Sequence, residues 1–177
     1  PKAAARRLLR EMNVEQPPVP VDALARHVGA ELSYRSLEGD ISGLLYRDEG
    51  RKVIGVNALD APTRQRFTIA HEIGHLLLHP GHTVIVDKLV KVNFRATASM
   101  PVARREEERQ ANEFAAELLM PERLVKGFAS DMVGDSLLFS KDDLVRALAQ
   151  RFDVSPIAME YRLVNLGLLD DLAVQGG

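Results

Sequence analysis

Two histidines near the middle of the chain have the spacing of a metal-binding pair. His71 and His75 enclose Glu72 in the run His-Glu-Ile-Gly-His, an H-E-x-x-H pattern. On an α-helix, residues four positions apart are separated by about 40° around the axis and by about 6 Å along it, so both imidazoles can reach one metal ion. Glu72, next to His71, is placed to hold a metal-bound water instead of the metal itself. The pattern therefore predicts a metal site with an open, water-holding position.

The later histidines are poor candidates for a third ligand, which catalytic zinc requires in addition to a water. His79 continues the spacing of four, but it has drifted about 80° around the helix from His71. This drift favours a place at the helix end or behind a ligand. His82 follows Pro80 and Gly81, and its position is not predictable.

A carboxylate on a second helix is the better third ligand. Residues 103–120 predict a strong helix whose apolar positions form one buried stripe. Glu108 flanks this stripe, and Asn112 follows four positions later on the same side. We expect Glu108 to complete the site and Asn112 to hold a ligand in place through a hydrogen bond. Three other carboxylates of this helix point farther round and favour solvent: Glu106, Glu107 and Glu113.

The elements that must position these residues predict an α+β fold with one small sheet. Hydrophobic periodicity and the proline and glycine positions indicate helices at about residues 2–12, 21–28, 62–79, 103–120, 141–151 and 155–165, with a short helix after Pro121. Strands are indicated at 31–37, 41–47 and 52–57, in an antiparallel meander, with a weaker signal at 83–94. Helices before and after a run of strands are typical of the α+β class.

The predicted H-E-x-x-H helix contains a glycine in its interior. Gly74 costs about 1 kcal/mol relative to alanine, which favours a close approach of another backbone, such as the adjoining sheet. Ile69, Ile73, Leu76 and Leu77 recur at helical spacing, so we expect them to face the core and the histidines to lie on a different face.

The composition narrows both the site and the class of protein. The chain has 177 residues, of which 46% are hydrophobic and 27% are charged, the mix of a globular domain with a real core. It has no cysteine, so disulfides and cysteine-based zinc sites are excluded, and a metal site must use histidine and carboxylate. The formal net charge of −2 argues against a dedicated nucleic-acid binder. No apolar stretch is long enough to span a membrane and the N-terminal residues do not read as a signal peptide, so we expect a cytoplasmic protein without a membrane partner.

Two long segments together resemble the ImmA/IrrE family of metallopeptidases. The first is Phe-Thr-Ile-Ala-His-Glu-Ile-Gly-His-Leu-Leu-Leu-His at residues 67–79, and the second is Glu-Arg-Gln-Ala-Asn-Glu-Phe-Ala-Ala-Glu-Leu-Leu-Met-Pro at residues 108–121. Shorter family-like segments lie at residues 20–25, 43–57 and 152–155. The resemblance covers most of the chain. It implies a zincin-like fold, with the small three-stranded antiparallel sheet packed against helices and a C-terminal helical extension.

The resemblance also implies roles for particular residues. His71, His75 and Glu108 would be zinc ligands and Glu72 the general base, although His/Glu sites also accept Mn²⁺ or Fe²⁺. The metallopeptidase domain would comprise residues 1–130, with residues 131–177 as a helix-turn-helix-like extension packed on it. Family members typically cleave a helix-turn-helix repressor and so relieve repression in a stress or mobile-element response. The implied partner is therefore a protein substrate of that kind.

Peptide hydrolysis would also need a hydrogen-bond donor for the developing oxyanion besides the metal. Four side chains that the sequence does not separate are candidates: Tyr46, Arg64, Arg66 and Arg95. An extended substrate could pair with an exposed edge of the sheet, which we expect within residues 41–57.

Two other functions remain open at this stage. Residues 144–163 look like a helix-turn-helix, which would suit a DNA-binding regulator. However, residues 141–171 carry four basic and six acidic residues, a net charge of −2 that suits phosphate poorly. The third hypothesis is a non-catalytic sensor or adaptor, in which metal binding switches a protein interaction. It predicts metal binding without proteolysis.

Overall fold

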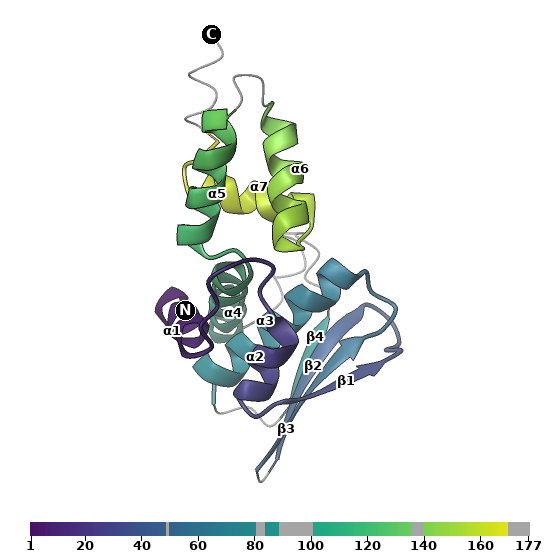
Figure 1. Ribbon diagram of the computed structural model, residues 1–177. Helices are drawn as coiled ribbons and strands as arrows, with labels where there is room; N and C mark the ends of the chain where they lie inside the picture. Colours follow the sequence, from purple (N-terminus) through teal and green to yellow (C-terminus); the bar gives the residue numbers. More distant parts are fainter. Residues whose placement is uncertain (49, 81–83, 89–100, 136–139, 170–177) are drawn as a thin grey trace.

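Seven helices and four strands make up the part of the chain described by the computed structural model, which comprises residues 1–48, 50–80, 84–88, 101–135 and 140–169. The helices are α1 (Lys2–Glu11), α2 (Val21–His27), α3 (Pro62–Leu78), α4 (Val102–Leu119), α5 (Glu122–Asp135), α6 (Lys141–Phe152) and α7 (Pro156–Asn165). The strands are β1 (Glu31–Arg35), β2 (Ile41–Asp48), β3 (Arg51–Asn57) and β4 (Val84–Lys88). The sheet and α1–α4 form one part of the molecule, and α5–α7 lie together at its other end (Figure 1). The predicted α+β class is confirmed.

The sheet is mixed, and its described strands lie in the order β1-β3-β2-β4. β2 is antiparallel to both β3 and β4. β1 instead runs parallel to β3, with Glu31 beside Val53 and Arg35 beside Asn57. The prediction of a three-stranded antiparallel meander is therefore wrong in two respects, because β1 pairs with β3 instead of β2 and because β4 adds a strand.

The side chain of Asn57 holds the segment that connects β1 to β2. Asn57 ends β3 and is only 6% exposed. Its amide nitrogen donates to the carbonyl oxygens of Ile41 and Leu37, at 2.9 and 3.4 Å, and its amide oxygen accepts a hydrogen bond from the Leu37 N–H at 3.4 Å. These bonds satisfy the backbone of the segment between β1 and β2, which crosses the end of β3.

This strand order also places the edges of the sheet. β2 and β3 are both internal, and the edge strands among the described residues are β1 and β4. The expectation of an exposed edge within residues 41–57 is therefore wrong. A substrate that extends this sheet would have to pair with β1 or β4.

The H-E-x-x-H residues lie on α3, in the centre of the molecule. Pro62 occupies the first turn of α3, where the missing N–H has no helical partner to lose. Residues 68–76 are all buried, because β2 packs on one side of α3 and α4 on another. The expectation that Leu77 faces the core is wrong, since Leu77 is 36% exposed, whereas Ile69, Ile73 and Leu76 are buried as expected. His71 and His75 are buried as well.

Gly74 lies where α3 and α4 pack closely. A Cβ atom at this position would lie 3.2 Å from Ala111 Cα, 3.3 Å from Ala111 O and 3.1 Å from the Phe114 ring. The expected close approach of another backbone is confirmed, but the neighbour is α4 and not the sheet. Because α4 carries Glu108, this contact sets the distance between the helices of the candidate ligands.

Replacement of Gly74 by alanine is expected to lower the free energy of unfolding by up to about 2 kcal/mol. The added methyl group overpacks α4 at a cost of about 1–3 kcal/mol, whereas better helix propensity returns about 1 kcal/mol. The matched control is Gly127→Ala in α5, because no described atom lies within 4 Å of a Cβ added there. This control should be stabilised by up to about 1 kcal/mol. Urea unfolding measures both, and stabilisation of both variants would contradict the tight contact at Gly74.

Candidate metal centre

Three buried donor groups converge between α3 and α4. The Nε2 atoms of His71 and His75 are 3.0 Å apart. Glu108 Oε2 lies 3.3 Å from His71 Nε2, and Glu108 Oε1 lies 3.5 Å from His75 Nε2. The three residues are 7%, 1% and 6% exposed, and together they form a group that could hold a metal ion. The structure thus brings together the three side chains that the sequence proposes as ligands.

The separations of the donor atoms fit a tetrahedral metal ion. Ligand atoms bound at about 2.0–2.1 Å with tetrahedral angles lie about 3.3 Å from one another. The observed values of 3.0, 3.3 and 3.5 Å lie around this distance. Two imidazoles and one carboxylate also leave a fourth position for water or substrate, as in catalytic zinc sites. The residues present therefore fit the ion that the H-E-x-x-H pattern predicts.

Glu108 is held as a carboxylate inside the protein. Burial raises its pKa, but contacts with His71 and His75 lower it more, so that the pKa of Glu108 lies well below its ordinary value. Apart from the 3.3 Å contact with His71 Nε2, the buried Glu108 Oε2 has no hydrogen-bond partner among the residues that the structure describes. Arg104 Nε lies 3.8 Å from the other carboxylate oxygen, Oε1. A buried carboxylate with so few partners is costly, and a divalent cation held between it and the two histidines would compensate its charge.

Asn112 contacts the ring of His71 on the side away from the other donors. Its Oδ1 lies 2.9 Å from His71 Nδ1 and can accept a hydrogen bond from that nitrogen. In this arrangement the lone pair of His71 Nε2 is left to face His75 and Glu108. The hydrogen bond that we expected from the helical spacing is therefore present.

Replacement of Asn112 by alanine is expected to weaken zinc binding by about 10- to 100-fold, because His71 loses the partner that orients its ring. The matched control is Asn165→Ala, which changes an asparagine of α7 that lines the same cavity as His71. Competition with a chromophoric chelator measures the zinc dissociation constant of each variant. An unchanged constant for Asn112→Ala would show that burial alone orients His71.

Glu72 lies beside β2 and is not one of the clustered donors. It is fully buried, and a Cβ atom at Gly43 of β2 would lie 3.1 Å from Glu72 Oε1 and overlap the side chain of Thr68. Glycine at position 43 therefore leaves room for the Glu72 carboxylate. Its absence from the donor group fits a role other than that of a metal ligand.

Arg47 of β2 is a residue of this site that the sequence analysis missed. Its guanidinium donates to the carbonyl oxygens of His75 and His79, both at 2.7 Å, in the last turn of α3. Burial lowers the pKa of Arg47, and the nearby Glu72 carboxylate opposes this effect. The His75 carbonyl also accepts the helical hydrogen bond from the His79 N–H at 3.0 Å, so Arg47 is a second donor there, and it ties the turn of His75 to the sheet. No sequence pattern indicated this role, because an arginine near the end of a strand is ordinary.

His79 does not join the donor group. His79 is the C-cap residue of α3, as its expected place at the helix end suggested. It is not among the clustered donors found in the described residues. His82 lies outside the described residues.

A cavity of about 960 Å³ opens beside the donor group and extends to α7. His71 and Glu108 line it near the metal centre, and Ile157 and Tyr161 line it from α7. The α7 side of the cavity lies near the end of α4. Arg162 of α7 donates to the carbonyl oxygen of Met120, the residue that follows α4, at 2.9 Å. The cavity thus joins the candidate metal centre to the C-terminal helices.

Of the candidate oxyanion donors that can be placed, Arg64 lines this cavity and Tyr46 and Arg66 do not, although Arg64 Nε also donates to Ser42 Oγ at 3.1 Å and lies 3.5 Å from Asp60 Oδ2. Arg66 instead donates to the carbonyl oxygens of Val19 and Asp153. The hydroxyl of Tyr46 donates to the exposed carboxylate of Asp48. Arg95 lies outside the described residues. The geometry therefore favours Arg64 among the three that can be placed.

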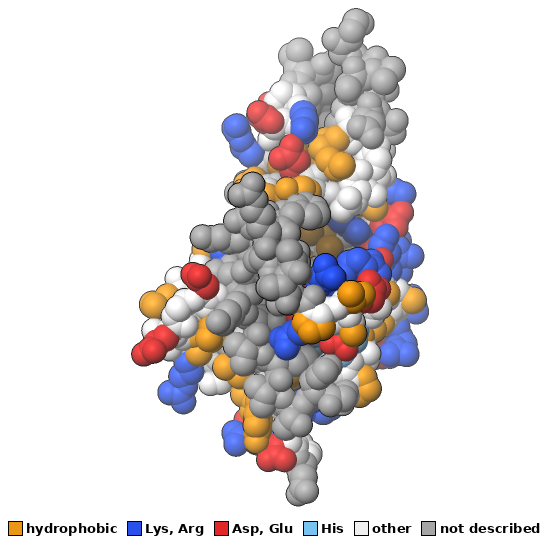
Figure 2. Space-filling model, turned by 180° about the vertical axis from the view of Figure 1, so that it is seen from behind, with side chains coloured by type: hydrophobic (Ala, Val, Ile, Leu, Met, Phe, Trp, Pro, Cys, Tyr) orange, Lys and Arg blue, Asp and Glu red, His pale blue; other side chains and the backbone are white. Residues whose placement is uncertain are grey.

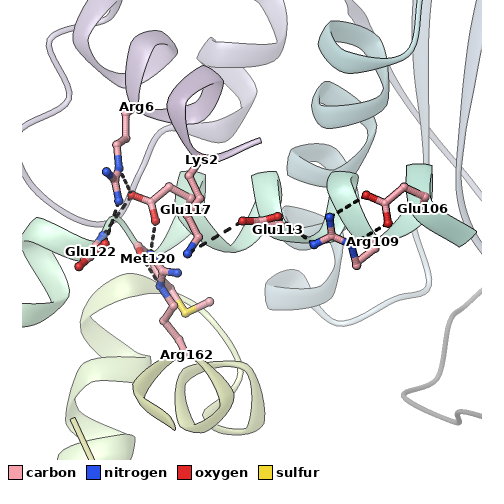
Figure 3. A network of polar contacts seen from close by, with 9 residues as sticks. All are labelled: Lys2, Arg6, Glu106, Arg109, Glu113, Glu117, Met120, Glu122 and Arg162. Atoms are coloured by element: carbon pink, nitrogen blue, oxygen red, sulfur yellow. Dashed lines mark hydrogen bonds and ion pairs between the residues drawn. The ribbon is translucent and has the colours of Figure 1, made fainter. Parts of the chain in front are cut away.

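An ion-pair network that is buried at Arg162 and Glu117 and exposed at Arg6 joins α7 to α4 and α1 (Figure 3). Arg162 of α7 pairs with Glu117 of α4, and the two residues are 4% and 1% exposed. Arg6 of α1 donates to the other carboxylate oxygen of Glu117 at 2.7 Å and to Glu122 at 2.8 Å. The C-terminal helices are thus attached to the helix that carries Glu108.

The described surface shows charges of both signs. Lys and Arg side chains are interspersed with Asp and Glu side chains on the face drawn in Figure 2. Residues 141–165, which include α6 and α7, carry four basic and four acidic residues, and one of the basic residues, Arg162, is buried. This region therefore offers no basic excess to phosphate. Within the described ranges, no helix is both long and apolar enough to cross a membrane.

Comparison with known proteins relates this chain to peptidases and phage proteins. Metallopeptidase ImmA of Bacillus subtilis (strain 168) is 27% identical over 130 residues, which cover 73% of this chain and 66% of that protein. Uncharacterized immunity region protein 2 of Bacillus phage phi105 is 28% identical over 128 residues, which cover 72% of each chain. The matched part of this chain therefore corresponds to 66% of the length of Metallopeptidase ImmA.

A solved structure shares the fold. A Mycobacterium tuberculosis transcriptional regulator superposes with a TM-score of 0.60 and 19% identity, over 92% of this chain and 45% of that one. The profile of the IrrE N-terminal-like domain, peptidase M78, matches residues 25–164, which include α3, α4 and all three donor residues. The chain belongs to this family of IrrE N-terminal-like domains, the ImmA/IrrE family.

Proposed function

We propose that this chain is a zinc-dependent endopeptidase. The observation that carries the proposal is the convergence of the His71, His75 and Glu108 donor atoms between α3 and α4, at separations that suit a tetrahedral ion. Membership of the peptidase M78 family supports it. His/Glu sites also accept Mn²⁺ and Fe²⁺, so these ions belong in the test.

In this proposal His71, His75 and Glu108 hold the metal and Glu72 is the general base. A bound divalent ion supplies Lewis-acid activation of water and of the scissile carbonyl. Glu72 takes a proton from the attacking water at its carboxylate and later delivers it to the leaving nitrogen. Arg64, which lines the cavity, is the candidate donor to the developing oxyanion.

The proposed substrate is a helix-turn-helix transcriptional repressor, whose cleavage relieves repression in a stress or mobile-element response. Similarity to Metallopeptidase ImmA supports a protein substrate, and similarity to an immunity region protein of a phage supports the mobile-element context. A repressor substrate would also place the reaction in the cytoplasm.

The proposed organisation is a zincin-like metallopeptidase domain at residues 1–130 with a helical extension at residues 131–177. The buried pair of Arg162 and Glu117 supports packing of the extension on the domain. The charge balance of α6 and α7 does not favour direct DNA binding, although their order resembles a helix-turn-helix.

The test of this function mixes the purified chain with a helix-turn-helix repressor, chosen first from the genes next to its own. We expect one main cut in the repressor, which a chelator abolishes and which one of Zn²⁺, Mn²⁺ and Fe²⁺ restores. Tight metal binding without a cut under any of the three ions would instead indicate a metal-dependent adaptor. A duplex-DNA titration at low and high salt serves as the second arm, and tight, salt-sensitive binding would favour a DNA-binding regulator.

A further inference from the structure

The cavity beside the candidate metal centre has an apolar end on α7 that the proposed chemistry does not use. Ile157 and Tyr161 line this end and are 66% and 54% exposed. Leu119 and Met120, from the end of α4, and Val154, from the loop before α7, also line the cavity. Large apolar side chains that stay exposed together commonly mark a binding surface.

The cavity follows one face of α4 from the metal centre to this apolar end. Glu108, Asn112, Ala116 and Leu119 all line it, at intervals of three or four residues that place them on one helix face. With a rise of 1.5 Å per residue, the separation from Glu108 to Leu119 is about 17 Å along the helix axis. An extended polypeptide covers this distance in about five residues.

Arg162, on the same helix as Ile157 and Tyr161, offers no free charge at the apolar end; the other basic residues that line the cavity, Lys2, Arg64 and Arg109, come from other elements. Arg162 also lines the cavity, but its guanidinium is buried and engaged by Glu117 and by the carbonyl of Met120. The surface presented by Ile157 and Tyr161 therefore suits an apolar side chain better than an acidic one.

We propose that this end binds a large apolar side chain of the protein substrate, about five residues from the bond that is cut. The inference rests on the proposed peptidase function. A polypeptide that occupies the whole cavity presents one peptide bond at His71 and Glu108 and a more distant side chain at Ile157 and Tyr161, because the same cavity reaches both pairs. The occupant is thus the substrate chain itself, extended along α4.

The first test measures binding without cleavage. The probe is an array of 15-residue peptides of random sequence, incubated with the full chain carrying Glu72→Gln and loaded with zinc. We expect binding to rise with the content of Leu, Ile, Phe and Met. Adding Ile157→Ser and Tyr161→Ser should weaken it by about tenfold or more, because two apolar contacts are lost. Val164→Ser is the matched control, since Val164 is 51% exposed on α7 but is not among the residues that line the cavity.

The second test measures the spacing of the preference. The chain with native Glu72 and zinc is given the same peptides in solution, and mass spectrometry locates the cuts. In the peptides cut by the native chain and by Val164→Ser, we expect a large apolar residue about five positions from the cut, always on the same side of it. The Ile157→Ser/Tyr161→Ser variant should lose this preference while its zinc content is unchanged.

The outcomes separate this inference from the proposed function. Apolar binding that depends on Ile157 and Tyr161, without any cut in the peptides or in the repressor, would retain the docking surface and reject the peptidase. Cuts with no apolar preference, or with one that the double variant retains, would overturn the inference and keep the peptidase. An equal effect of Val164→Ser would also overturn it.

Two other occupants are tested by the same variants. A dimer in sedimentation equilibrium that Ile157→Ser/Tyr161→Ser converts to a monomer would assign the surface to a second copy of the chain. The variant Leu172→Ser/Val174→Ser tests the C-terminal residues of the chain itself as the occupant. If this variant binds the peptide array tenfold or more tightly than the parent chain, the surface would be assigned to those residues. Either result would overturn the assignment to a substrate.

Discussion

The Glu72→Gln variant is expected to retain its metal and to lose peptidase activity by about 100- to 10,000-fold, the usual contribution of a general acid–base group. Glutamine has nearly the shape of glutamate, so the fully buried space beside Gly43 stays filled. The amide, however, cannot take a proton from water at neutral pH. The rate of repressor cleavage and the metal content of the purified variant are the two measurements.

Glu106→Gln is the matched control for this experiment. Glu106 is an exposed carboxylate of α4 that pairs with Arg109, at 2.7 Å, and it is not among the clustered donors of the described residues. Its replacement should leave the rate unchanged. Full cleavage by metal-loaded Glu72→Gln would show that another group takes the proton. Loss of the metal from this variant would instead place Glu72 among the groups that hold the ion.

The positions of the candidate ligands could be predicted because each pair is a local feature of one helix. His71 and His75 are one turn apart on α3, and Glu108 and Asn112 are one turn apart on α4. The packing of the two helices is not local. The sequence shows that Gly74 needs room, but only the fold shows that α4, and not the sheet, occupies it.

The direction of the buried side chains could not be predicted for α3. Amphipathic periodicity distinguishes a core face from a solvent face, and residues 68–76 have no solvent face because both the sheet and α4 cover them. The pattern therefore assigned Leu77 to the core, whereas it is 36% exposed.

The strand order and the role of Arg47 depend on hydrogen bonds between distant parts of the chain. Arg47 donates to the carbonyl oxygens of His75 and His79, at 28 and 32 residues' separation. Asn57 holds Ile41 across the end of β3, at a separation of 16 residues. Neither contact has a periodic signature, so alternation alone favoured the simpler meander.

Replacement of Arg162 by methionine is expected to lower the free energy of unfolding by about 3 kcal/mol, the low end of the range for breaking a buried ion pair. Arg162 is 4% exposed, and its contacts with Glu117 and with the Met120 carbonyl join α7 to α4. Methionine can fill the space of the aliphatic stem, but it leaves these acceptors buried without that donor. The cost stays at the low end because Arg6 still donates to Glu117.

Urea unfolding followed by circular dichroism measures this effect, with Lys141→Met as the matched control. Lys141 of α6 pairs with Glu160 of α7 at 2.8 Å, but the two side chains are 51% and 48% exposed. An exposed pair contributes little, so the unfolding midpoint of the control should barely change. An Arg162→Met variant as stable as the control would show that water reaches the Arg162–Glu117 pair.

Hydrogen exchange on the same variant tests how the C-terminal helices relate to the metal centre. We expect amides of α7 to lose protection before those of α3, because Arg162 is a buried polar link between α7 and α4 whereas α3 is held by the sheet and α4. Zinc affinity should then persist while the apolar preference carried by Ile157 and Tyr161 weakens. Equal loss of protection in α3 and α7 would show one cooperative unit and would contradict a separable extension. Earlier loss of protection in α7, with zinc affinity retained and the apolar preference weakened, would mean that the pair of Arg162 and Glu117 couples substrate selection to α4, the helix that carries Glu108.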